Sequence, residues 1–253
     1  LVLRVGASLI APHRVTFDRS SRFYRRTNRA NSDMSTAEIR QAFAASEDTP
    51  RKIRDLHRQA LAAAEGADMP VRLRGEPAAI LTIAPLSVLR EARSLPVGRD
   101  DVVFPPRMTG AINTVVGLDS VIVHSPVDDG SGAVRTFSIN HRRGYIDHAW
   151  TIGHEKDGTT YVWQDNFVVK IEEAARSTLA RLRAHGIEGP WIVMATLIRI
   201  KGARLFLGDH QLSEPAWQDP AFLGEIIDDR LDKDALKPFV DGFWRVFGVD
   251  AAQ

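Results

Sequence analysis

Residues 20–43 read SSRFYRRTNRANSDMSTAEIRQAF, and this stretch decides how the first part of the chain folds. Aromatic and arginine side chains crowd into residues 22–27, where we expect a β-strand. Residues 15–17 form a short extended run before it, and a turn at residues 18–21 joins the two segments. The pattern therefore predicts a hairpin that closes a sheet.

Side chains alternate across a strand, so the aromatic and basic residues divide between its two faces. Phe23 and Arg25 lie on one face, and Tyr24 and Arg26 lie on the other. Each face of the predicted strand thus carries one aromatic ring and one guanidinium group.

A helix with a complete start signal follows the strand. Ser35 at the N-cap and Glu38 three residues later form a capping box, in which each side chain accepts a hydrogen bond from the backbone N–H of the other residue. Ile39 and Phe43 lie four residues apart and share the buried face of a helix that runs to about Ser46.

A second helix is predicted from Thr49 and Pro50 to Gly66. It carries an apolar stripe of Ile53, Leu56 and Ala60, and an opposite stripe of Arg51, Arg54 and Arg58 with Asp55 among them. In one interpretation the arginine stripe extends a phosphate-binding surface. In the other it is a solvated helix face whose charges pair with their neighbours.

Positive charge is concentrated near the beginning of the chain. Residues 1–60 hold 12 Arg and Lys against 6 Asp and Glu, a net +6, and the whole chain is +1, so the remainder sums to −5. The surplus is almost entirely arginine, whose planar guanidinium suits phosphate contact better than lysine does.

The composition is that of a globular protein, with 44% hydrophobic and 26% charged residues. No cysteine is present, which excludes disulfides, zinc–thiolate sites and thiol catalysis and favours the cytoplasm. No apolar run approaches the ~20 residues of a membrane helix, so we expect no membrane partner. The start, LVLRVGASLI, lacks an initiator Met and reads as a strand already under way, which suggests an N-terminal truncation.

From residue 71 onward, strands and helices mix without a βαβ series. We expect a strand at 78–84, a hairpin of 134–140 with 145–151, a helix from 165 to about 185, and a second hairpin of 191–200 with 204–207. An acidic irregular segment follows at 213–234, and Pro238 at a helix N1 position opens the last, aromatic helix. The fold class is α+β, with a mixed, mainly antiparallel sheet and packed helices.

Histidines and carboxylates gather at residues 141–155. Asp147 and His148 are adjacent on a strand, so they point to opposite faces and cannot serve one site. We interpret the group as a polar hairpin surface and expect no metal, since no metal-binding spacing such as H-E-x-x-H occurs.

Recognised catalytic and cofactor motifs are missing from the sequence. There is no G-x-S-x-G elbow, no P-loop and no G-x-G-x-x-G, so we expect no cofactor and identify no catalytic constellation. Trp217 is the one tryptophan in a Pro- and acid-rich loop, and we expect it to be exposed while the others pack in cores.

The run Arg22-Phe23-Tyr24-Arg25-Arg26, followed by Asn31, Met34 and the helix Ala37-Glu38-Ile39-Arg40, resembles a bacterial family with a Schlafen-type, AlbA-like nucleic-acid-binding domain. The strong part covers residues 1–47. Beyond it, segments such as Ala84-Pro85-Leu86-Ser87 are similar only in architecture. Relatives carry most of the AlbA-like domain upstream of this strand, including the acidic residues of nuclease members, and this chain carries none of it.

The resemblance implies three parts. Residues 1–46 would be the C-terminal remnant of a truncated AlbA-like α/β domain, residues 47–70 a connecting helix, and residues 71–253 a further α+β domain. The family also implies contact with nucleic acid, DNA or RNA, at the basic strand. The residues expected to bind it are Arg22, Tyr24, Arg25, Arg26, Arg19 and Arg29.

Arginines at these positions can contact phosphates while the tyrosine stacks on a base. Six neutralised phosphates would give a slope on the order of −5 in log K against log salt. The alternative is an edge strand whose arginines stay solvated or pair with Asp18, Asp33 and Glu38.

Two other functions stay open at this stage. One is a metal-dependent nuclease of the same family, with its catalytic carboxylates upstream of this chain. The other is an interaction or oligomerisation module, in which the last aromatic helix packs on a partner such as a second copy. We favour a non-catalytic nucleic-acid-binding protein.

Overall fold

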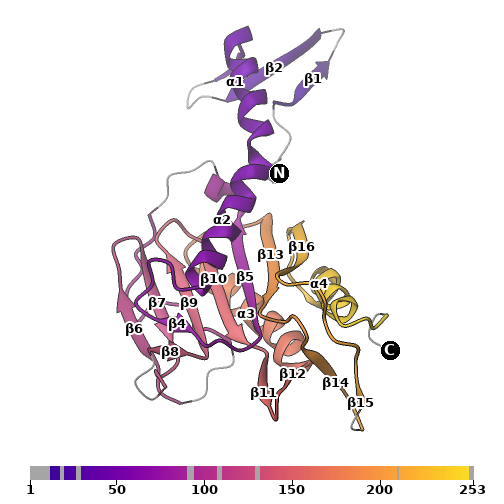
Figure 1. Ribbon diagram of the computed structural model, residues 1–253. Helices are drawn as coiled ribbons and strands as arrows, with labels where there is room; N and C mark the ends of the chain where they lie inside the picture. Colours follow the sequence, from indigo (N-terminus) through magenta and orange to yellow (C-terminus); the bar gives the residue numbers. More distant parts are fainter. Residues whose placement is uncertain are drawn as a thin grey trace. The chain divides into compact units, whose positions relative to one another are not determined.

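The computed structural model describes residues 12–17, 20–26, 30–89, 94–106, 110–128, 132–209 and 211–250 (Figure 1). It divides into two compact units, Leu1–Asp55 and Leu56–Gln253, and the division falls inside one helix. No helix in the described part of the chain is both long enough and apolar enough to cross a membrane.

The first unit is a small antiparallel sheet with one helix. Its elements are β1 (Arg14–Phe17), β2 (Ser20–Arg26), β3 (Asn31–Asp33) and α1 (Thr36–Glu47), followed by the start of α2 (Thr49–Ala64). The predicted hairpin and both helices are confirmed, whereas β3 was not predicted. The strand expected at residues 1–5 lies outside the described residues.

The second unit begins in α2 and contains two larger sheets. Its elements are β4 (Arg72–Leu73), β5 (Ala78–Pro85), the 3₁₀ turn η1 (Leu86–Leu89), β6 (Asn113–Val116), β7 (Ser120–His124), β8 (Ala133–Val134), β9 (Thr136–His141), β10 (Ile146–Thr151), β11 (Gly153–Lys156), β12 (Thr159–Trp163), α3 (Asp165–Ala184), β13 (Trp191–Ile198), β14 (Arg204–Gly208), β15 (Gln211–Leu212), β16 (Ala221–Asp228) and α4 (Lys233–Val246).

The main sheet has seven strands in the order β16-β13-β5-β10-β9-β7-β6, and every neighbouring pair is antiparallel. A second sheet, β11-β12-β14-β15, contains one parallel pair, β12 with β14. The two-stranded pair β4-β8 is also parallel. The fold is therefore α+β with mixed, mainly antiparallel sheets, as predicted.

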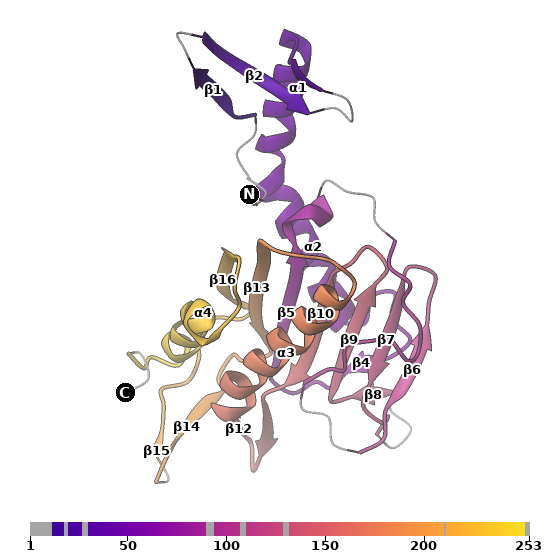
Figure 2. The same cartoon turned by 180° about the vertical axis from the view of Figure 1, so that it is seen from behind.

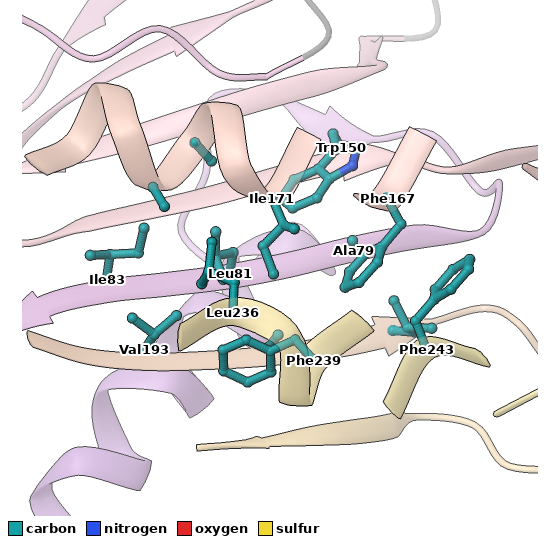
Figure 3. Close-up of a cluster of buried hydrophobic side chains, with 14 of the residues drawn as sticks. Ala79, Leu81, Ile83, Trp150, Phe167, Ile171, Val193, Leu236, Phe239 and Phe243 are labelled. Carbon is teal, nitrogen blue, oxygen red and sulfur yellow. The ribbon is translucent and has the colours of Figure 1, made fainter. Parts of the chain in front are cut away.

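Both faces of the main sheet are covered around its central strands, because β5 and β13 are buried at all eight positions. Alternate residues of β5 join different clusters: Leu81 packs with α3 and α4, and Ile80 packs with the C-terminal turns of α2. Figures 1 and 2 show α2 on one face and α3 with α4 on the other. Figure 3 shows Phe167, Ile171 and Phe239 pointing onto this second face.

Two predicted elements in the second unit are wrong. β13 and β14 do not form a hairpin, because β13 lies between β5 and β16 while β14 joins the second sheet. Arg199, in the left-handed region at φ 59°, lies in the connection that separates them. A strand with apolar residues on both faces is buried fully only in the middle of a covered sheet, and that is where β13 lies.

The last helix begins at Lys233 and not at Pro238. Asp232 is its N-cap and accepts a hydrogen bond from the Ala235 N–H at 3.1 Å, so the cap sets the start and the proline is tolerated inside. The segment predicted as irregular also contains β16. The aromatic side chains of α4, including Phe239 and Phe243, and the Phe247 that follows the helix are buried in the unit's own core.

Candidate nucleic-acid interface

The three-stranded sheet of the first unit has two chemically different faces. Residues directly opposite each other in an antiparallel pair share a face, so Phe23, opposite Arg14, lies on one side. Tyr24, opposite Asp33, lies on the other. The alternation expected along residues 22–26 is therefore realised.

Helix α1 covers the face that carries Phe23. The rings of Phe23 and Phe43 meet edge to face, with centroids 5.9 Å apart. The backbone N–H of Met34 donates to the Phe23 carbonyl at 2.8 Å, which fixes the chain where it enters the helix. We call this side the helix face.

The predicted capping box forms at the start of α1. The Ser35 N–H donates to Glu38 Oε2 at 2.8 Å, and the Glu38 N–H donates to Ser35 Oγ at 3.3 Å. These hydrogen bonds from Ser35, with the nearby Arg25, lower the pKa of the Glu38 carboxyl. Glu38 is therefore a stable anion at neutral pH.

Arg25 lies on the helix face and is engaged there. Its guanidinium forms an ion pair with Glu38, and its Nε donates to Ser32 Oγ at 3.2 Å. Arg25 thus links β2, β3 and the first turn of α1. Its side chain is 54% exposed and lies on the helix face, so it does not belong to the opposite face.

The other side, which we call the open face, carries Tyr24 and Arg22 on β2 and Val15 on β1. Tyr24 is 43% exposed and Val15 is 48% exposed. Arg26 follows Tyr24 by two residues on the same strand, opposite Asn31. This strand thus places an exposed aromatic ring between two arginine positions.

Arg22 is paired on the open face. Its guanidinium forms a hydrogen-bonded ion pair with Asp33, which raises the pKa of Arg22 above its ordinary value. More than half of the Arg22 side chain is exposed, so water and salt screen this pair strongly. A phosphate group can therefore compete with Asp33 for the guanidinium.

The remaining predicted arginines are not brought to this face by the described structure. Arg19 and Arg29 lie outside the described residues. In α2, Arg51 lies 3.5 Å from Asp48, and Arg58 falls in the second unit. Of the six predicted residues, Arg22 and Tyr24 lie on the open face and Arg25 does not, while Arg26 occupies the next position of the same register on β2.

The histidine and carboxylate group at residues 141–155 is a polar surface only in part, because His154 and Glu155 are exposed, His141 is partly exposed, and Asp147 and His148 are buried. Asp147 is 2% exposed and His148 is fully buried, because β10 lies in the interior of the main sheet. The sequence signal for this was available: β10 reads IDHAWT between apolar strands, and a central strand is buried on both faces.

A chain of hydrogen bonds runs from Asp147 to α2 on one face of the sheet. Thr82 Oγ1 donates to Asp147 Oδ1 at 2.7 Å, and His57 Nδ1 lies 2.9 Å from Thr82 Oγ1. Because the Thr82 hydroxyl donates its proton to Asp147, the neutral His57 ring must carry its proton on Nδ1 and donate to Thr82 Oγ1. His57 Nε2 then accepts from Thr196 Oγ1 at 2.7 Å.

The same carboxylate reaches a partly exposed histidine. His141 Nε2 lies 2.8 Å from Asp147 Oδ2, and the His141 ring stacks on Tyr145 with centroids 3.9 Å apart. On the opposite face of β10, His148 Nε2 lies 2.9 Å from Thr178 Oγ1. Burial lowers the pKa of both His57 and His148 to about 4 and raises that of Tyr145.

This network holds α2 and α3 against the sheet and contains no metal-binding set. Among the residues that the structure describes, no three His, Asp or Glu side chains are grouped to hold a metal ion. We interpret the network as a polar link within a covered sheet, since every donor in the His57 chain is matched to an acceptor.

Comparisons of the chain with family models, with curated proteins and with solved structures find no match. The Schlafen-type resemblance therefore stays a prediction, and the functional assignment depends on the geometry of the two units.

Proposed function

We propose that this protein binds single-stranded nucleic acid on the open face of its N-terminal sheet, with a base stacked on Tyr24 and phosphates on Arg22 and Arg26. The observation that carries the proposal is the 43% exposed Tyr24 on a sheet face that α1 leaves uncovered, between two arginine positions. Stacking requires a base outside a duplex, so the geometry favours a single strand.

The charge distribution supports an electrostatic contribution. The first 60 residues carry a net +6, which attracts a polyanion from a distance. The Asp33 carboxylate opposes this attraction at close range, since it must release Arg22 before a phosphate binds. We therefore expect moderate affinity that weakens steeply with salt. A cytoplasmic location, suggested by the absence of cysteine, belongs to the same proposal.

The test is fluorescence anisotropy with labelled 20-nucleotide oligo(dT) and oligo(U), in a salt series. Tyr24→Ala should weaken binding by about 1–3 kcal/mol, roughly 5- to 100-fold, because one stacked base is lost. Arg22→Ala and Arg26→Ala should each reduce the slope of log K against log salt by about 0.7.

Arg25→Ala is the matched control, because Arg25 lies on the same strand but on the helix face. Its affinity should stay within a factor of about two of the wild type if circular dichroism shows an unchanged fold. No detectable binding at low salt, or a Tyr24→Ala variant that binds as tightly as the wild type, would refute the proposal.

A further inference from the structure

The second unit has a groove between α3 and the segment that enters α4. Its volume is about 620 Å³, within the range of small-molecule sites. The floor is apolar and is made by Leu179 and Ala180 of α3 and by Leu231. Figure 2 shows α3 and α4 on the same face of the main sheet.

Basic side chains line both walls of this groove. Arg176 and Arg183 come from α3, and Arg230 and Lys233 come from the segment that enters α4. Two carboxylates, Glu172 and Asp232, also line it, so the groove keeps a net positive charge. The groove is thus positive although the net charge of residues 61–253 is negative.

The carboxylates do not neutralise all four cations. Arg230 and Arg183 make only long ion pairs, at 3.8 Å to Asp232 and 3.9 Å to Glu188. Asp232 is also the N-cap of α4 and accepts from the Ala235 N–H. Within the described part of the chain, Arg176 and Lys233 are exposed and form no ion pair, so both are available to a ligand.

Helix electrostatics do not explain Arg176. A basic residue near a helix C-terminus is favoured by the macrodipole, but only within the last turn. Arg176 lies more than two turns before the end of α3 at Ala184. Arg181, near that end, instead donates to the Asp101 backbone carbonyl at 2.7 Å.

The spacing of the cations indicates an extended anion. Arg176 and Arg183 are seven residues apart on one helix, about 10 Å along its axis. This spacing suits a chain of two or three phosphates, which can engage both cations at once, better than a single phosphate. The apolar floor offers a surface for the organic part of such a ligand.

We propose that this groove binds an organic phosphate that carries two or more linked phosphoryl groups. Arg176 and Lys233 contact the phosphates from opposite walls, and Leu179 and Leu231 contact the organic moiety. This site is independent of the open face in the first unit.

Isothermal titration with pyrophosphate, tripolyphosphate and ADP on the full chain tests the site. The double variant Arg176→Glu/Lys233→Glu should weaken binding of all three at least tenfold, since it reverses two charges in the groove. Lys201→Glu is the charge control, because Lys201 is exposed in a turn that does not line the groove, and it should bind like the wild type.

Orthophosphate is the ligand control, because it distinguishes specific binding of linked phosphoryl groups in the groove from a general attraction of anions to positive charge. It should bind at least tenfold more weakly than tripolyphosphate. The Tyr24→Ala variant should bind these ligands like the wild type. Equal losses in the double variant and the control, or no binding of any of the three, would overturn the proposal. So would a double variant that loses oligonucleotide binding alone, since the groove would then serve the nucleic-acid backbone.

Discussion

Lowering the pH from 7 to 5 should destabilise the second unit through two buried histidines. His57 is 4% exposed and His148 is fully buried, and desolvation lowers the pKa of each from 6.5 to about 4. Unfolding returns both rings to water, where they bind protons near pH 6.5. The unfolded chain therefore holds more protons than the folded unit between pH 4 and pH 6.5.

The sign and size of the effect follow from this difference. The free energy of unfolding has its full value above pH 6.5 and falls as the pH drops from 6.5 towards 4. With the pKa values of 6.5 and about 4, each histidine removes about 2 kcal/mol by pH 5. Together they remove about 4 kcal/mol, a large part of the stability of a typical domain.

Urea unfolding followed by tryptophan fluorescence measures this loss in the second unit alone. All five tryptophans, Trp150, Trp163, Trp191, Trp217 and Trp244, belong to that unit. His57→Gln and His148→Gln should each remove about half of the pH dependence between 7 and 5, whatever they do to stability at pH 7. A free energy of unfolding that is flat over this range, or a slope unchanged in both variants, would show that the histidines are not buried in neutral form.

Three other perturbations test separate parts of the structure. Thr82→Val leaves the buried His57 ring and the Asp147 carboxylate each without a hydrogen-bonding partner, so it should lower the free energy of unfolding of the second unit by about 2–4 kcal/mol in the same urea assay. A loss below about 0.5 kcal/mol would contradict the network. Ser35→Ala removes the cap of α1 and should lower the stability of that helix by about 1 kcal/mol, which faster amide exchange in its first turn would measure. Unchanged protection of those amides would contradict the prediction. Gly153→Ala would place a Cβ 2.1 Å from the Tyr161 carbonyl oxygen, so β11 and β12 should separate and the free energy of unfolding should fall by several kcal/mol. A variant as stable as the wild type would rule out this close approach.

Local signals predicted the first unit well. The hairpin and the capping box at Ser35 and Glu38 depend on residues close in sequence, so their geometry could be predicted without tertiary information. The division of β2 into two faces was predicted for the same reason. The sequence did not predict which of the two faces α1 covers, because that depends on the contact between Phe43 and Phe23.

In the second unit the sequence by itself determined the α+β class, the hairpin of β9 and β10, the extent of α3 and the exposure of Trp217, which is 80%. Local propensity and apolar periodicity carry those features. Only the tertiary structure decided that β13 pairs with β5 and that Asp147 lies beneath α2, linked to His57 through Thr82. Strand order and burial of polar groups depend on contacts between residues far apart in the chain, and short-range pattern does not encode them.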